Sequence, residues 1–109
     1  MKHWDLRALS VEPHHPEILH SARGEARSIL ISLPAGEALQ QHQVHERAYL
    51  VVVDGEVEIE HGAGTTSGGH GLLAVFDPAE PHEVRAREDS RVLLVLAPWP
   101  GDGHPGARD

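Results

Sequence analysis

Apolar residues in this chain of 109 residues come in short runs rich in Val, Ile and Leu, and turn residues separate the runs, with 11 Gly and 8 Pro in all. Short β-branched runs between Gly- and Pro-rich turns are typical of strands in an all-β domain. About eight such strands at regular spacing predict a single-domain, antiparallel double-stranded β-helix, a jelly-roll barrel that leaves few strand edges open.

The period of the apolar positions predicts where the strands lie. Alternation predicts a first strand over residues 4–9. The next segment has both helical and strand spacing, and we expect a short turn of helix followed by a strand over about residues 25–33. The later elements are a glycine-rich turn over residues 62–71 and strands over residues 72–76, 82–86 and 91–96.

The clearest local signal is Asp54-Gly55 between two β-rich runs, which predicts a two-residue hairpin. Pairing across this turn puts four apolar side chains on one face: Leu50, Val52, Val57 and Ile59. The other face then carries Glu56, Glu58 and Glu60. Because strand side chains alternate, positions 42, 44, 46 and 48 are expected to point inward as well.

The last twelve residues differ in composition from the rest. Residues 98–109 hold three Pro and three Gly, and we expect them to form a tail that is at least partly disordered, behind a barrel over residues 1–97. Trp99 is the exception, since a tryptophan after the last strand can plug a barrel end or a dimer interface.

Composition excludes several classes of function. Nine Lys and Arg against 17 Asp and Glu give a formal charge of −8, and the basic residues are scattered, so we expect no nucleic-acid partner. Arg85, Arg87 and Arg91 are interpreted as a solvated sheet face. The absence of cysteine excludes disulfides, thiolate metal sites and a cysteine nucleophile. No run approaches the roughly 18 apolar residues of a membrane span and no signal peptide is apparent, so a cytoplasmic location without membrane contact is expected.

Histidine is the unusual residue, with ten in 109. Gly36, His42 and Gly55 have the order and nearly the spacing of one motif, and the segment from Asp77 to His82 contains a second. From about residue 35 to residue 96 this arrangement resembles the cupins, a family of small double-stranded β-barrels. The resemblance implies a metal site inside the barrel, of whose four ligands His42 and His82 are present. Val44, Ala48 and Ala86 stand where the family motifs have His, Glu and Asn.

Two neighbouring residues can extend the histidine pair. Glu46 shares the inward parity of His42, whereas His45 reaches the interior only through a bulge and is otherwise expected in an exposed loop. A site of His42, His82 and Glu46 or His45 would hold a divalent transition metal (Fe, Mn, Ni or Zn) with open coordination positions. Alternatively, Gln40, Glu46 or a buried water satisfies the imidazoles, or Glu46 forms a surface ion pair with an arginine such as Arg47.

Three functional hypotheses follow from this pattern. In the first, the metal supports a small-molecule reaction such as dioxygenation or isomerisation. In the second, the barrel binds a small molecule without metal. In the third it serves mainly to dimerise, and a homodimer is expected. The interior pocket is predicted to be lined by Val44, Ala48, Leu50, Val52 and Phe76. The six histidines in loops and terminal segments, His14, His15, His20, His61, His70 and His104, are expected at the surface.

Overall fold

The computed structural model describes residues 1–42 and 44–105, with the backbone alone for residues 40–42. Its regular structure is strand, which confirms the all-β class. The strands are β1 (Glu17–Ser21), β2 (Glu25–Leu33), β3 (Ala38–His42), β4 (Arg47–Asp54), β5 (Glu56–His61), β6 (Gly64–Gly69), β7 (Leu73–Phe76), β8 (His82–Ala86) and β9 (Ser90–Trp99). No helix in the described residues is long and apolar enough to cross a membrane.

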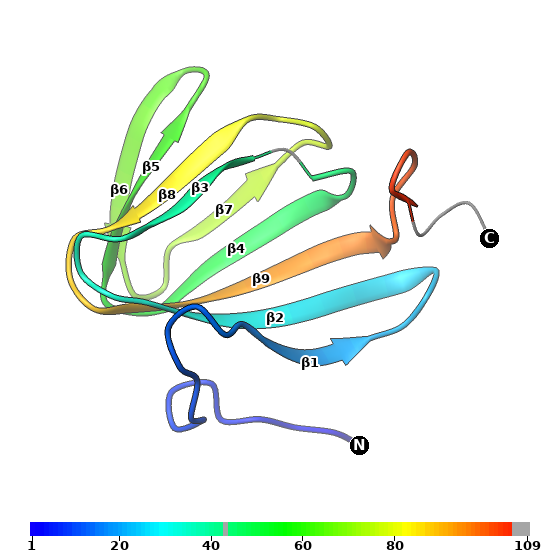
Figure 1. Ribbon diagram of the computed structural model, residues 1–109, viewed down its shortest axis with the longest axis horizontal. Coiled ribbons are helices and arrows are strands. Elements are labelled where there is room, and N and C mark those ends of the chain that lie inside the picture. The colour runs from blue at the N-terminus through cyan, green and yellow to red at the C-terminus, as the bar shows by residue number, and fades with distance from the viewer. Residues whose placement is uncertain (43, 106–109) are drawn as a thin grey trace.

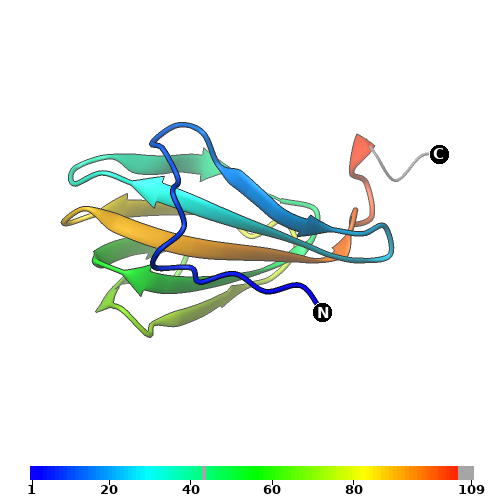
Figure 2. The same ribbon diagram turned by 90° about the horizontal axis from the view of Figure 1, so that it is seen from below.

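The strands form two antiparallel sheets that face each other (Figure 1). The larger sheet has the order β1-β2-β9-β4-β7 and the smaller one the order β3-β8-β5-β6. This is the expected double-stranded β-helix. The segment before β1 runs across the outer face of the larger sheet, over β2 and β9 (Figure 2).

The core lies between the sheets and is almost entirely aliphatic. Its side chains come from alternate positions of the strands, as the period of two predicts. The buried cluster consists of Ile31, Leu33, Ala48, Leu50, Val52, Val57, Ile59, Phe76, Val84, Ala86, Val92, Leu94 and Leu96. The four apolar residues that flank Asp54-Gly55 are therefore on the inner face, as expected.

The predicted hairpin at Asp54-Gly55 is wrong, although its face assignment is right. β4 pairs with β7 and β9, whereas β5 pairs with β6 and β8, so the chain crosses from one sheet to the other at this turn. Gly55 has φ of +88°. A Cβ at this position would lie 2.3 Å from Ser90 Oγ. The tight turn thus serves a sheet-to-sheet corner that packs on the start of β9.

Two predictions near the N-terminus are also wrong. Residues 4–9 form a turn in place of a strand, because the Asp5 carbonyl accepts hydrogen bonds from the N–H groups of Ala8 and Leu9. The expected helical turn is β1, which pairs with β2. Gly24, with φ of +81°, lies in the turn that joins them.

The glycine-rich segment over residues 62–71 is more ordered than expected. Only Gly62 and Ala63 form the turn after β5, and β6 then pairs with β5 along its whole length. β6 consists of Gly, Thr and Ser, so it lacks the alternation of apolar and polar residues by which a strand is normally detected. The segment is an exposed edge strand, protected by its polar composition.

The last strand runs three residues further than expected. β9 ends at Trp99, inside the predicted tail, and Gly101 beyond it is buried. The division of the chain at residue 97 stays a prediction, and residues 106–109 lie outside the described residues. The extension matters because it carries the chain over one end of the barrel.

Candidate functional site

The candidate site lies at the end of the barrel where β3 ends and β4 begins, at the right of Figure 1. The turn between β7 and β8 reaches the same end, since the Ala79 N–H donates to the Val44 carbonyl at 2.8 Å. β9 also ends there. Two chain reversals and the segment after β9 thus meet at this end of the barrel.

His82 begins β8 and points into the barrel, with 4% of its surface exposed. Its imidazole stacks on the Phe76 ring, with centroids 3.9 Å apart and planes 9° from parallel. Nδ1 lies 3.0 Å from the Glu80 carbonyl oxygen, which can only accept. Nδ1 therefore carries the proton in the neutral ring and Nε2 is its acceptor nitrogen.

The backbone of β3 places His42 next to this histidine. His42 and His82 are cross-strand partners in the β3–β8 ladder, just beyond a register shift after Leu39. Directly opposed residues of antiparallel strands are the nearest neighbours that a sheet provides. The side chain of His42 lies outside the described residues, so its part in a metal site stays a prediction.

Glu46 is the second buried titratable residue at this end, and only 2% of its surface is exposed. Its Oε2 accepts a hydrogen bond of 2.7 Å from the N–H of Gly101. The alternative of a surface ion pair with Arg47 is wrong, because Arg47 instead contacts Asp77 at 2.6 Å. The inward parity predicted for Glu46 is confirmed.

His45 lies in an exposed loop, as the odd parity suggested. Its ring packs edge-on against the ring of His104, with ring centroids 5.6 Å apart. The His104 ring packs in the same way against Trp99, with centroids 4.8 Å apart. The guanidinium of Arg27, on β2, lies over the Trp99 ring, with Cζ 4.0 Å from the ring centroid. Trp99 packs against the core, so it helps to plug this end of the barrel, as the sequence suggested.

The residues predicted to line an interior pocket are inside the barrel. Ala48, Leu50, Val52 and Phe76 belong to the buried core, and Val44 packs against it. Two hollows open at the end of the barrel, and of these five residues only Val44 lines one of the two. One of about 410 Å³ lies between residues 45–47, the Pro78-Ala79 turn and residues 97–102. The other, of about 260 Å³, lies between residues 44–46, Trp99 and residues 104–105. Glu46 lines both.

The described donors alone do not form a metal site. Among the described side chains, no group of three or more His, Asp or Glu lies close enough to hold an ion. Val44 and Ala48 offer no donor atoms where the family motif has His and Glu. A metal at this end would therefore need His42 beside His82, with Glu46 released from Gly101 or binding through its other oxygen.

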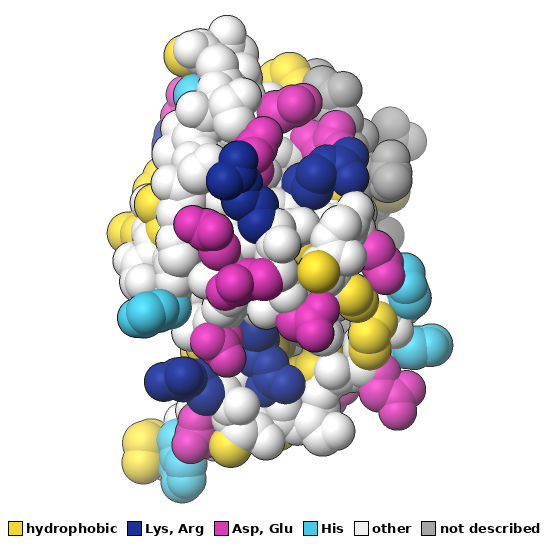
Figure 3. Space-filling model, turned by 90° about the vertical axis from the view of Figure 1, so that its left-hand side faces the viewer, with side chains coloured by type: hydrophobic (Ala, Val, Ile, Leu, Met, Phe, Trp, Pro, Cys, Tyr) yellow, Lys and Arg dark blue, Asp and Glu magenta, His cyan; other side chains and the backbone are white. Residues whose placement is uncertain are grey.

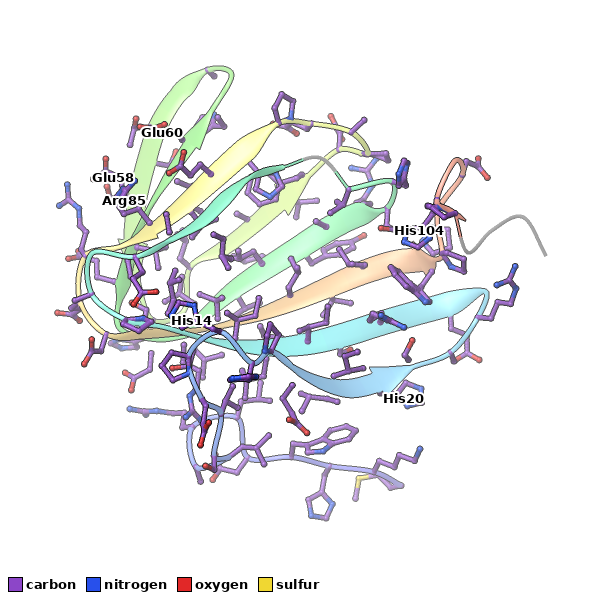
Figure 4. All side chains as sticks on the ribbon, viewed as in Figure 1. His14, His20, Glu58, Glu60, Arg85 and His104 are labelled. Atoms are coloured by element: carbon purple, nitrogen blue, oxygen red, sulfur yellow. The ribbon has the colours of Figure 1, made fainter. Side chains whose placement is uncertain are left out.

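Most other labelled titratable residues lie away from the site. His14 and His20 lie far from His104, which lines one of the two hollows, and Glu58, Glu60 and Arg85 belong to the smaller sheet (Figure 4). On the face shown in Figure 3, basic side chains are interspersed with acidic ones. Such a surface does not form a basic patch for phosphates.

The three arginines expected on one face separate into two groups. Arg85 pairs with Glu83, and Arg87 makes two bonds to Glu58, which raise the pKa of the Arg87 guanidinium further above its ordinary value. Arg91 lies on the other sheet and donates to backbone carbonyls of the N-terminal segment. The solvated-face interpretation is right for the first two and wrong for Arg91.

Sequence reasoning missed the role of the segment after β9. Gly101 contributes its backbone N–H, and a Cβ there would lie 2.4 Å from the His45 carbonyl oxygen. Neither property is visible in a run of Pro and Gly, which is equally typical of a disordered tail. One signal could have found it. Glu46 was predicted to point inward, and a buried carboxylate needs a hydrogen-bond donor from elsewhere in the chain.

Comparison with known proteins gives a consistent assignment. A family model described as a cupin domain matches residues 29–98. No curated protein matches the chain. Among solved structures, the TT1209 protein of Thermus thermophilus is 23% identical with a TM-score of 0.77, over 90% of this chain and 98% of that one. An RmlC-like cupin protein of Desulfovibrio desulfuricans is 26% identical with a TM-score of 0.76, over 90% and 96%. The protein SPY1581 of Streptococcus pyogenes, of unknown function, is 24% identical with a TM-score of 0.72, over 87% and 85%. Because the family model covers well over half of its length, the chain belongs to the cupin family.

Proposed function

We propose that this cupin binds a small organic molecule at the barrel end formed by Glu46, His82 and the segment after β9. The observation that carries the proposal is the burial of two titratable side chains, Glu46 and His82, at one end of an otherwise aliphatic interior. Burying such groups costs free energy, and a concave site with a few convergent polar groups is the usual place for a ligand.

The chemistry of these groups favours a ligand that donates hydrogen bonds. The Glu46 side chain accepts a hydrogen bond from Gly101 through Oε2. The contact of His82 Nδ1 with the Glu80 carbonyl makes Nε2 the acceptor nitrogen of the neutral ring. The hollow of about 410 Å³ beside Glu46 falls within the range of roughly 300–1,000 Å³ that is typical of small-molecule sites. A small alcohol, polyol or amine therefore fits better than a carboxylic acid.

The test is an NMR titration with a panel of small amines, polyols and carboxylates as probes. We expect an amine or polyol to shift amide signals of residues 44–48, 78–82 and 99–104, and the shifts to be lost in Glu46→Ala and His82→Ala. The carboxylates should leave these signals in place. If no amine or polyol shifts them, or if the two variants respond like the wild type, the proposal is wrong.

A divalent transition metal is the second candidate, and one contact favours it. Metal-binding histidines commonly donate their other ring N–H to a backbone carbonyl, as His82 does to Glu80. Together with His42 it would hold the ion, which would supply Lewis acidity to a bound molecule. The predicted dioxygenase or isomerase activity would require this metal. The cytoplasmic location stays a prediction.

Elemental analysis of protein purified without a metal-affinity tag tests this second candidate. We expect Fe, Mn, Ni or Zn near one equivalent, or binding of the added metal salts by calorimetry, and loss of both in His42→Ala and His82→Ala with an unchanged β-sheet spectrum. A wild type that neither carries nor binds these metals would exclude the metal and the enzymatic role, and leave the organic ligand to the NMR titration.

A further inference from the structure

β6 contributes little volume to the interior of the barrel. Thr66 and Gly68 are the register partners of Ile59 and Val57 on β5. Directly opposed residues of antiparallel strands share a face, so Thr66 and Gly68 belong to the inner face together with these two core residues. The described residues of the buried core cluster include none from β6. A strand of Gly, Thr and Ser therefore leaves space between the two sheets that larger side chains fill elsewhere.

Leu72, in the connection from β6 to β7, fills one part of this space. A Cβ on Gly68 would lie 2.8 Å from Leu72 Cδ2, so Leu72 packs directly on the glycine. Thr66 is exposed, although its partner Ile59 on the same face has only 2% of its surface exposed. The interior is thus filled over Gly68 and open to solvent over Thr66.

A hollow of about 170 Å³ lies at this opening. It is bounded by β5, β6 and β7, and β6 and β7 are the last strands of their sheets (Figure 1). None of its lining residues lines either hollow beside Glu46. We call it the side hollow, with an apolar wall of Ile59, Leu72 and Phe76 and a polar rim of His61, Thr66 and Glu80.

The size and wall of the side hollow fit one aromatic ring. A protein cavity of about 150 Å³ lined by Leu, Ile and Phe binds benzene, and the side hollow is slightly larger and has the same apolar residue types. Phe76 adds an aromatic neighbour, and pairs of aromatic rings gain free energy beyond the burial of their area. A polyol would lose the hydrogen bonds of its hydroxyl groups against this wall.

The rim supplies a place for one hydroxyl group. His61 Nε2 lies 2.9 Å from Thr66 Oγ1. A threonine hydroxyl donates and accepts, and so does the hydroxyl of a phenol, so a phenol can join this pair whichever group is the donor. We propose that the side hollow binds a small phenol, with the ring against Ile59, Leu72 and Phe76 and the hydroxyl at the His61–Thr66 pair.

The side hollow is separate from the site proposed beside Glu46, yet it adjoins His82. Phe76 stacks on the His82 ring, and the Glu80 carbonyl oxygen lies 3.0 Å from His82 Nδ1. Both residues also line the side hollow. A bound phenol therefore contacts two residues that position His82 without occupying the barrel end.

An NMR titration with phenol tests the proposal, with glycerol as the polyol control. Phenol should shift the methyl signals of Ile59 and Leu72 and give intermolecular nuclear Overhauser effects to them, whereas glycerol should leave these signals in place. Thr66→Leu puts an apolar side chain into the hollow, so it should abolish phenol binding and raise the midpoint of urea denaturation. The matched control is Thr65→Leu, the same change at the neighbouring position, which pairs with Glu60 on the outer face and should bind phenol like the wild type.

Benzene as a second probe tests the place of the hydroxyl group. Phenol should bind the wild type about two- to tenfold more tightly than benzene, the effect of one hydrogen bond. In His61→Ala this ratio should approach one, with an unchanged far-UV spectrum.

Three results would overturn the proposal: no phenol contact with the Ile59 and Leu72 methyl groups, equal phenol binding by Thr66→Leu and Thr65→Leu, or the same ratio of phenol to benzene affinity in His61→Ala and the wild type. None of these substitutions alters Glu46 or His82, so binding at the barrel end succeeds or fails independently.

Discussion

The buried carboxylate of Glu46 accepts a hydrogen bond from the backbone N–H of Gly101 at 2.7 Å, and this bond joins the loop before β4 to the segment after β9. Glu46 lines both hollows at this end of the barrel. The bond therefore both satisfies a buried carboxylate oxygen and holds the start of the segment after β9 beside the loop that precedes β4.

Removing the Glu46 side chain should loosen the barrel end. We expect Glu46→Ala to lower the free energy of unfolding by about 1–3 kcal/mol, the cost of leaving the buried Gly101 N–H without its acceptor. Glu46→Gln keeps an acceptor oxygen and should lose less. Urea denaturation measures both, with the exposed Glu60→Ala as control. If Glu46→Ala were as stable as the control, the contact would not be a structural one.

Gly101 is required for close approach to the loop before β4. A Cβ there would lie 2.4 Å from the His45 carbonyl oxygen and 3.0 Å from the Glu46 nitrogen. Gly101→Ala should therefore displace residues 99–105, at a cost of about 1–3 kcal/mol as for overpacking, and change the fluorescence of Trp99. Gly62→Ala is the matched control, since a Cβ at Gly62 meets nothing within 4 Å. Identical spectra for the two variants would contradict the clash.

Much of the fold was predictable because burial has a period of two in strands. The inner positions of β4 and β5 around Asp54-Gly55 were correct, and so were the bounds of β2 and β8. The partners of those strands were not predictable. Asp-Gly permits positive φ in a hairpin and in a sheet-to-sheet corner alike, and only the contact of Gly55 with Ser90, which is distant in sequence, decides between them.

The candidate site was predictable only in part for a related reason. Parity placed Glu46 inside and His45 outside, and motif order singled out His82. The stack of His82 on Phe76 and the bond from Gly101 depend on packing between segments distant in sequence. A backbone donor in a Pro- and Gly-rich run carries no side-chain signal, so residues 98–109 were expected to be at least partly disordered.

Phe76 supports His82, and its truncation should show this. Phe76→Ala should cost about 3–5 kcal/mol, as for large-to-small changes in a core, because Phe76 is 4% exposed and belongs to the buried cluster. Phe76→Leu keeps most of the volume and should cost less than about 1.5 kcal/mol. Both variants lose the parallel ring stack, so both should shift the imidazole carbon-bound proton signals of His82 in NMR spectra. Unchanged signals in Phe76→Leu would mean that the stack does not determine the environment of the ring.

Arg91 should control whether the N-terminal segment stays on the sheet. One guanidinium nitrogen donates to both the Leu6 and Leu9 carbonyls, and the segment shields Leu30. Arg91→Ala should therefore raise hydrogen exchange at residues 1–16 and at β2, and lower stability by about 1.5–3 kcal/mol. Arg87→Ala removes an arginine that pairs with Glu58 on the other sheet, and should leave exchange in both segments unchanged. When the N-terminal segment leaves the sheet, Leu30 becomes exposed, so Arg91→Ala should enlarge the exposed apolar surface of the larger sheet. Exchange that rose equally in the two variants would show that the segment is held by something other than Arg91.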